Sequence, residues 1–375
     1  MNSIVKVILS IIVIVLIVWG LASWLKSPVT PPTATEPIKI GFIGPLTGDV
    51  SSLGTISRAA VELAVEEVNT QGGVSGQPIQ VVYEDGQCSP QPASSAAAKL
   101  INANKVNAII GGLCSSETSA FASGAMQQKK IVISYCSSAP TLSQTGKYFF
   151  RTYPSDSYQG RFAAEYAYNK LGVKKVAIIY HISDWGTGLR DVFAARFAEL
   201  GGTIVLDEGT LQEARDYRTQ LTKLKNIQAD YLYAPVYVEG GIALINQMNQ
   251  LGIKTRILAG DTFSDPKLKK EASGKADILF TQTITPSGGE FLTKLTAKTK
   301  VDQMPLCAPQ AYDAVKILTK SANEVGLDPD KLADAIRATN YIGVSGQINF
   351  DVNGDLTSAA YKVSRITDGK SVDLN

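Results

Sequence analysis

Residues 106–118 constrain the fold more than any other stretch of the sequence. They read VNAIIGGLCSSET, so a short apolar run ends in two glycines, and a cysteine and two serines follow before a helix-like segment begins at Glu117. This pattern predicts a buried strand that turns sharply into a helix. Ligands of open α/β sheets bind outside the carboxyl ends of such strands, and the free N–H groups at a helix start attract anions. We therefore expect Ser115 to help hold a small anionic group.

The same layout recurs along the chain. Three further strand-like runs end in polar or aromatic side chains: 130–134 before Ser138, 229–236 before Tyr237, and 255–260 before Asp261. Two α/β units that face each other would place the hydroxyl donors of Ser115 and Ser138 on one wall of a cleft. The phenol of Tyr237 and the carboxylate of Asp261 would then lie on the other wall. One wall suits a carboxylate and the other an ammonium, so the pattern predicts a site for a zwitterion.

The order of elements predicts an α/β protein. Strand-like runs at 38–44 and 78–83 alternate with segments at 55–69 and 93–103, whose apolar residues have helical spacing. Strand, helix, strand, helix, strand is typical of a parallel sheet covered on both faces. A second unit of this kind begins near residue 158, and a length of 375 residues suits about two domains.

Two shorter patterns give local expectations. Asn353-Gly354 lies between strand-like runs at 346–351 and 359–363, which is a strong signal for a β-hairpin. Glu117 and Glu239 stand at expected helix starts, and we expect both to be solvated acids.

Composition excludes several classes of function. The formal net charge of +2 gives no reason to expect nucleic-acid binding. His181 is the only histidine, which excludes most His-ligated metal sites and makes a His-based catalytic triad a poor prediction. The sequence GTGLRD at 186–191 resembles a dinucleotide-binding fingerprint but has Asp191 where the third glycine belongs. We expect a binding protein that is not an enzyme, without metal or cofactor, in which Trp185 is an aromatic wall of the cleft.

The N-terminus has a different character. Residues 7–25 carry no charge and consist mainly of Ile, Val and Leu, with Trp19 and Trp24 near the far end. This run is long enough to span a bilayer, and tryptophan is common at the membrane interface. The alternative is a cleaved secretory signal with a weak small-residue site at 20–22. We favour a membrane anchor over 1–26, followed by a stiff proline-rich linker over 27–37, with the remainder exported.

Export makes disulfides possible. The four cysteines, Cys88, Cys114, Cys136 and Cys307, allow three pairings. A bridge between Cys88 and Cys114 would close a modest loop and add roughly 3 kcal/mol on a chain-entropy model. Cys136 and Cys307 would then be either a second pair or two buried thiols.

Several segments together resemble one family. They are IGFIGPLTG at 40–48, VNTQGGV at 68–74, ED at 84–85 with Cys88, GLCSS at 112–116, SAPTL at 138–142, FRT at 150–152, DWG at 184–186 and AGD at 259–261. From residue 38 onward the chain is similar to the leucine/isoleucine/valine-binding proteins, the solute-binding components of branched-chain amino-acid ABC transporters. The resemblance implies a type I periplasmic-binding fold of two Rossmann-like lobes joined by three crossover strands. Lobe I would comprise 38–155 and 285–350, and lobe II 156–284 and 351–375.

The resemblance also implies a ligand site and a disulfide. It pairs Cys88 with Cys114, and it places Ser115, Ser138 and the backbone at Cys136 on the carboxylate and amine of an amino acid. Further implied contacts are Asp261 to the ammonium, the aromatic residues Tyr237 and Trp185, and the cleft residues Leu53, Cys114 and Cys307.

The implied function is to bind an amino acid by hinge closure and hand it to an ABC permease at the extracytoplasmic face of the membrane. A membrane-tethered sensor ectodomain with the same cleft is the alternative.

Overall fold

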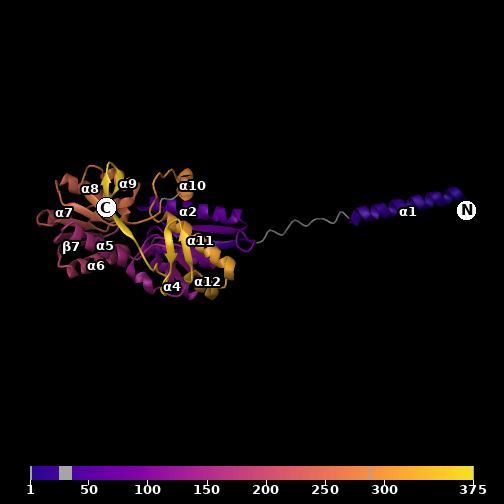
Figure 1. Cartoon of the computed structure of the whole chain (residues 1–375), viewed down its shortest axis with the longest axis horizontal. Helices are drawn as coiled ribbons and strands as arrows, with labels where there is room; N and C mark the ends of the chain where they lie inside the picture. The colour runs from indigo at the N-terminus through magenta and orange to yellow at the C-terminus, as the bar shows by residue number, and fades with distance from the viewer. Residues whose placement is uncertain (1, 25–35, 287–288, 375) are drawn as a thin grey trace. The chain divides into compact units, whose positions relative to one another are not determined.

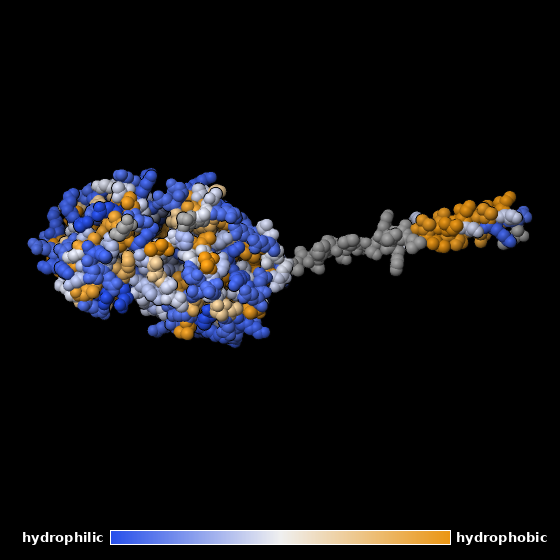
Figure 2. Space-filling view, in the orientation of Figure 1, coloured by the Kyte–Doolittle hydropathy of each residue, from blue (hydrophilic) through white to orange (hydrophobic). Residues whose placement is uncertain are grey.

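The structure, a computed structural model, describes residues 2–24, 36–286 and 289–374. Residues up to Glu36 form one unit, and Pro37–Asn375 form a second. In the first unit, helix α1 (Ser3–Trp24) exposes its apolar side chains from Ile4 to Trp19, which Figure 2 shows as an orange surface. The helix is long and apolar enough to cross a membrane, and a signal sequence can have the same length and composition. The predicted linker over 27–37 lies outside the described residues except for its last two.

A five-stranded parallel sheet in the order β2-β1-β3-β4-β5 forms the core of one half of the second unit. Its strands are β1 (Ile38–Gly44), β2 (Ile79–Asp85), β3 (Ala108–Ile110), β4 (Ile131–Ser134) and β5 (Phe149–Arg151). Successive side chains point to opposite faces of a sheet. Phe42 and Ile110 accordingly pack in one apolar cluster, and Ile43 and Ile109 pack in another.

Helices cover both faces of this sheet. The cluster around Phe42 includes α2 (Ser51–Thr70) and α11 (Ala308–Val325), and the cluster around Ile43 includes α3 (Pro90–Ala98) and α4 (Ser115–Gln127). Figure 1 labels helices of this half, among them α2, α4 and α11. Every residue of β3 and β4 is buried, which is typical of a parallel sheet covered on both sides. The sequence predicted this arrangement correctly.

The other half is built on a seven-stranded sheet in the order β14-β13-β10-β9-β8-β6-β7. The central strands are parallel, and β13 and β14 run antiparallel at one edge. The strands are β6 (Lys175–His181), β7 (Thr203–Thr210), β8 (Tyr231–Ala234), β9 (Arg256–Ala259), β10 (Ile278–Thr283), β13 (Tyr361–Thr367) and β14 (Lys370–Leu374). The helices of this half are α5 (Asp156–Glu165), α6 (Asp184–Glu199), α7 (Arg218–Lys225), α8 (Val238–Gln250) and α9 (Pro266–Ala272).

The remaining elements are short or return to the first sheet. They are α10 (Gly289–Thr299), α12 (Pro329–Arg337), β11 (Asn340–Gly343), β12 (Gly346–Asn349) and the helical turns η1 (Lys99–Ala103), η2 (Pro140–Gln144), η3 (Tyr166–Lys170) and η4 (Asp261–Ser264). Helix α10 packs against α2, and α12 packs against α11. The chain therefore passes between the halves three times, after β5, after β10 and after β12.

A buried ion pair joins two of these passages. Arg151, at the end of β5, is fully buried, and its Nε and Nη2 donate to the two carboxylate oxygens of Asp355 at 2.7 and 2.9 Å. Such bidentate pairs fix geometry as well as charge. The first and third passages are thereby held side by side.

The predicted hairpin around Asn353-Gly354 is reduced to a turn with one antiparallel bridge, between Phe350 and Leu356. The turn exists, because the Gly354 N–H donates to the Asp351 carbonyl at 3.1 Å. The flanking strands pair elsewhere, since β12 pairs with β11 and β13 pairs with β10 and β14. The turn lies in the passage between the halves, where the two strands belong to different sheets.

Candidate ligand-binding site

One cavity at the carboxyl ends of the strands brings most of the predicted site residues together. Its accessible volume is about 20 Å³, room for about one water molecule, so a larger ligand needs its walls to separate. Its lining residues are Leu53, Leu113, Ser115, Cys136, Ser138, Trp185, Tyr237, Asp261, Thr262 and Leu306. Ser115 and Asp261, which follow strands of different sheets, therefore face the same space. Leu113, Thr262 and Leu306 were not expected from the sequence.

Cys114 and Cys307 are not among the described residues that line the cavity. Cys114 forms a disulfide with Cys88, and Cys307 forms one with Cys136. Cys114 and Cys307 nevertheless stand beside residues that line the cavity: Leu113 and Ser115 flank Cys114, and Leu306 precedes Cys307. The second disulfide settles the alternative that the sequence left open for Cys136 and Cys307.

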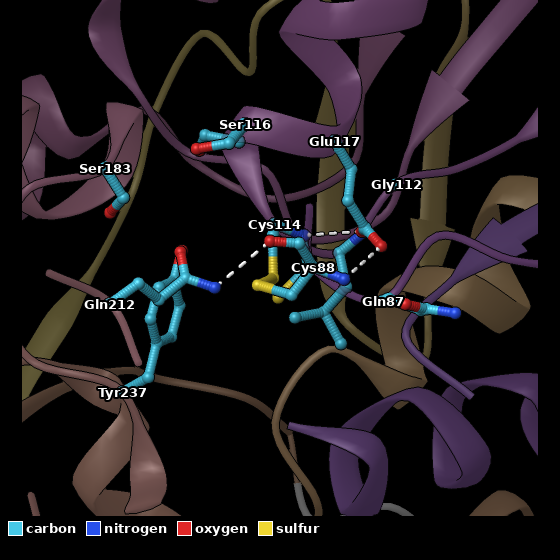
Figure 3. The surroundings of a disulfide bond; sticks show 12 residues. Gln87, Cys88, Gly112, Cys114, Ser116, Glu117, Ser183, Gln212 and Tyr237 are labelled. Atoms are coloured by element: carbon cyan, nitrogen blue, oxygen red, sulfur yellow. Dashed lines mark hydrogen bonds between the residues drawn. A yellow bond between two sulfur atoms is a disulfide. The ribbon is translucent and has the colours of Figure 1, made fainter. Parts of the chain in front are cut away.

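Glu117 fixes the turn between β3 and α4. Its carboxylate accepts the N–H of Cys88 at 2.9 Å and the N–H groups of Leu113 and Cys114 at 3.1 Å, as Figure 3 shows in part. The side chain is completely buried, so the expectation of a solvated acid is wrong. Burial raises the pKa of Glu117 to about 7, and the three N–H bonds oppose that rise. The turn carrying Ser115 is thus tied to the Cys88 loop by a disulfide and a carboxylate.

The Ser115 hydroxyl is oriented as a donor toward the cavity. Its oxygen accepts the N–H of Ser138 at 3.2 Å and the N–H of Ala139 at 3.1 Å. A serine hydroxyl has two lone pairs and one proton. With both lone pairs occupied by the backbone, the proton is left for an acceptor, which matches the predicted role toward an anionic group.

The Ser138 hydroxyl has the opposite polarity. It donates to Asp156 Oδ2 at 2.9 Å, and the Asp156 N–H donates back to the Ser138 carbonyl at 2.8 Å. Because the proton of this hydroxyl is directed to Asp156, only its lone pairs remain for the cavity. The expectation of two hydroxyl donors on one wall is therefore corrected: Ser115 donates, and Ser138 accepts.

Asp261 lies at the start of η4, directly after β9. The Tyr153 hydroxyl donates to its Oδ2 at 2.6 Å. Burial raises the pKa of Asp261 to about 6, and the hydrogen bond from Tyr153 opposes that rise. The carboxylate is therefore mostly ionised at neutral pH, although it is only 4% exposed. A cation in the cavity would complete its charge pairing.

Gln159 joins Asp261 to Asp156. One end of its amide faces both carboxylates, and the other faces the Asp261 N–H and the Thr281 hydroxyl. The amide nitrogen therefore lies at the carboxylate end, 3.3 Å from Asp261 Oδ2 and 3.1 Å from Asp156 Oδ1. The sequence did not predict Tyr153, Asp156 or Gln159, because nothing in the passage from β5 to α5 indicates that it lies near Asp261, about 100 residues further along the chain.

Aromatic side chains form the wall next to Asp261. The rings of Trp185 and Tyr237 lie with centroids 4.7 Å apart. The Tyr237 N–H donates to His181 Nδ1 at 3.1 Å, and His181 Nε2 lies 2.8 Å from the Tyr217 hydroxyl. Burial lowers the pKa of His181 to about 3, so the ring is neutral and orients the Tyr237 backbone through its hydrogen bond. The buried Tyr237 hydroxyl has no hydrogen-bond partner in the part of the chain that the structure describes.

The sequence matches the model of one known protein family. The model for periplasmic binding proteins matches residues 37–370. The chain belongs to the periplasmic binding protein family. This confirms the resemblance noted from the sequence motifs and, with the two sheets described above, the type I periplasmic-binding fold. The structure itself shows the apolar helix that precedes it, α1.

Individual members of the periplasmic binding protein family match over almost the whole chain. The leucine-, isoleucine-, valine-, threonine- and alanine-binding protein of Pseudomonas aeruginosa is 26% identical, over 88% of this chain and 90% of that protein. The Leu/Ile/Val-binding protein of Escherichia coli K12 is also 26% identical with the same coverage. Among solved structures, a leucine-binding protein of Thermotoga maritima has a TM-score of 0.84 and 29% identity, over 90% of this chain and 98% of that one.

Proposed function

We propose that this periplasmic binding protein is the substrate-binding component of an ABC transporter and that its ligand is an amino acid with an aliphatic side chain. The observation that carries the proposal is the opposed polarity across one cavity, where the Ser115 donor faces the Asp261 carboxylate. The printed names of the relatives support it, since a branched-chain amino acid transporter substrate-binding protein of Streptococcus pneumoniae, solved with isoleucine, is 27% identical with a TM-score of 0.78.

The ligand carboxylate is assigned to the wall that carries Ser115. The hydroxyl donates into the cavity, and the residue opens α4, whose N-terminus carries partial positive charge. The ligand ammonium is assigned to Asp261 and to the lone pairs of Ser138. Charge-assisted hydrogen bonds in a dry cleft are stronger than neutral ones, so both ends of a zwitterion gain from closure.

The ligand side chain is assigned to an apolar surface. Leu53, Leu113 and Leu306 come from the first half of the molecule, and Trp185 faces them from the second. This surface carries no charge, so it favours an aliphatic side chain over a charged one. Leu53 reaches the cavity because α2 begins at Ser51, four residues earlier than the sequence predicted.

Binding is proposed to proceed by closure of lobe I (38–155 and 285–350) on lobe II (156–284 and 351–375). Polar contacts already span the two lobes beside the cavity. Gln212 Nε2 donates to the Cys88 carbonyl at 3.1 Å (Figure 3), Ser52 donates to Asp265 at 2.9 Å, and Arg215 pairs with Asp49. An open form would lose these contacts and would present half of the headgroup site on each lobe.

Helix α1 is proposed to anchor the protein at the extracytoplasmic face of the membrane, beside its permease. The length and apolar character of α1 support an anchor. Fractionation of cells, followed by extraction of membranes with carbonate, tests this. An anchored protein stays in the membrane pellet, and a protein with a cleaved leader is released with the soluble fraction.

Calorimetric titration of the full chain in detergent tests the binding function. Leucine, isoleucine and valine are expected to bind with micromolar or tighter dissociation constants, about 8 kcal/mol of binding free energy. Lysine and glutamate are expected to show no binding. Tight binding of a charged amino acid with no binding of leucine would contradict the proposed ligand class.

A further inference from the structure

Asp156 is a buried carboxyl group just behind the cavity wall. It is the first residue of α5, follows the first passage between the halves, and is fully buried. It is not one of the residues that line the cavity, and it reaches the cavity through two neighbours that hydrogen-bond to it. Burial raises the pKa of Asp156 well above its ordinary value. Its hydrogen bonds to these two neighbours are therefore what let it act on the site without touching a ligand.

The first neighbour is Ser138. Two hydrogen bonds clamp the pair: the Ser138 hydroxyl donates to Asp156 Oδ2 at 2.9 Å, and the Asp156 N–H donates to the Ser138 carbonyl at 2.8 Å. The clamp leaves the hydroxyl no freedom to turn its proton into the cavity, so the side chain of Ser138 is available there only as an acceptor.

The second neighbour is Gln159, one turn along α5. Its amide nitrogen has two protons, and the two nearest acceptors are Asp156 Oδ1 at 3.1 Å and Asp261 Oδ2 at 3.3 Å. Its amide oxygen accepts the Asp261 N–H at 3.2 Å. Gln159 thus fixes the Asp261 backbone and carboxylate together, and Asp156 fixes Gln159.

The charges around this group favour a cation. Asp156 and Asp261 are two buried acids joined through one amide. The nearby Arg151 directs its guanidinium to Asp355, to the Ser143 hydroxyl and to the Ala139 carbonyl. A buried carboxylate without a charged partner is costly, so a ligand ammonium in the cavity would offset the burial of Asp261, which lines it.

We propose that Asp156 is a positioning residue of the ammonium subsite, which holds Ser138 as an acceptor and, through Gln159, holds Asp261 toward the ligand. This inference rests on the proposed amino-acid-binding function. According to this inference, Asp156 helps the protein to bind an amino acid more tightly than the same compound without its amino group, although Asp156 does not contact the ligand.

Replacement of Asp156 by asparagine tests the proposal because it should reverse the polarity of Ser138. The Gln159 amide nitrogen is a donor, so the asparagine side chain would turn its oxygen toward Gln159. Its NH₂ group would then face Ser138 and donate to the Ser138 hydroxyl. The Ser138 proton would then point at the ligand ammonium. Calorimetry of the full chain in detergent is expected to show an affinity for leucine at least about tenfold lower and an affinity for 4-methyl-2-oxopentanoate changed by less than about threefold.

A double-mutant cycle separates this role from a general structural one. In a Ser138→Ala background there is no hydroxyl to reverse, so Asp156→Asn is expected to lower leucine affinity by less than about threefold. The proposal would be overturned if Asp156→Asn lowered leucine affinity equally in the unaltered and Ser138→Ala proteins. It would also be overturned if the substitution lowered the affinities for leucine and the 2-oxo acid equally.

A matched control uses Asp313, a fully buried aspartate on α11 that accepts the N–H groups of Val344 and Ser345 away from the cavity. Asp313→Asn is expected to lower thermal stability and to leave the ratio of the two affinities unchanged. If the unaltered protein binds leucine and Asp156→Asn leaves the ratio of leucine to 2-oxo acid affinity unchanged, the role assigned to Asp156 is wrong and the proposed function stands. If the unaltered protein does not bind leucine, the proposed function fails as well.

Discussion

The oxygen of the Ser115 hydroxyl accepts the backbone N–H of Ser138 at 3.2 Å, and this contact joins the ends of two neighbouring parallel strands. It explains how two serines 23 residues apart along the chain acquire opposite roles. The backbone fills the lone pairs of Ser115, so its proton faces the cavity. The proton of Ser138 is held by Asp156, so its lone pairs face the cavity.

Replacement of Ser115 by alanine removes a donor and leaves two buried N–H groups, those of Ser138 and Ala139, without their acceptor. We expect leucine affinity to fall by about one to two orders of magnitude, and stability to fall by about 1–3 kcal/mol. Calorimetry and urea unfolding measure the two effects. Unchanged affinity in a folded variant would show that the Ser115 hydroxyl does not contact the ligand.

Glu117→Gln should destabilise the protein. The carboxylate accepts three N–H groups, and an amide in its place would turn one NH₂ group toward an N–H donor. We expect a loss of about 1–3 kcal/mol in the free energy of unfolding, measured by denaturation in urea with the disulfides intact. Glu239→Gln is the control, since Glu239 also begins a helix but pairs with Lys267 at the surface. Equal stability of the two variants would contradict the role assigned to Glu117.

The Cys136–Cys307 disulfide closes a loop with a sequence separation of 171 residues. Replacing both cysteines by serine should lower the free energy of unfolding by about 2–5 kcal/mol, because a long loop constrains the unfolded chain. Thiol titration of the unaltered protein, unfolded without reductant, should find no reactive cysteine. Two reactive thiols there would show that Cys136 and Cys307 are not bonded.

The pKa of Asp261 gives a pH dependence with a definite sign. Burial raises this pKa from 3.8 to about 6, so between about pH 4 and pH 6 the folded, ligand-free protein holds a proton that the unfolded chain has lost. Stability without ligand should therefore decline as pH rises through that window, by at most about 3 kcal/mol. Leucine affinity should change in the opposite direction and weaken below about pH 6, because the ammonium needs the ionised carboxylate. Melting temperatures and titrations between pH 4 and 8 measure both trends. In Asp261→Asn the affinity trend should disappear and the stability trend should become smaller, because Glu117 and Asp313, whose pKa values burial raises to about 7 and about 6, still titrate.

The fold and much of the cavity lining could be predicted because both follow from one rule, that the carboxyl ends of parallel strands meet at one edge. Ser115, Ser138, Tyr237 and Asp261 all follow strands, and each lines the cavity. Asp156 and Gln159 could not be predicted. They lie in the first turn of a helix that follows a passage between sheets, and their distance from the cavity depends on how the two halves meet. The predicted hairpin is limited to one bridge for the same reason, since a turn signal does not reveal that the strands beyond it belong to different sheets.

The most direct test compares leucine with 4-methyl-2-oxopentanoate, which has the same carboxylate and side chain but no ammonium, by calorimetric titration of the unaltered protein and of Asp261→Asn. Loss of one partner of a buried charge pair costs about 3 kcal/mol or more. The unaltered protein should therefore prefer leucine by more than about 100-fold, and Asp261→Asn should lose most of that preference. Equal binding of the two compounds by the unaltered protein would contradict recognition of an ammonium by Asp261.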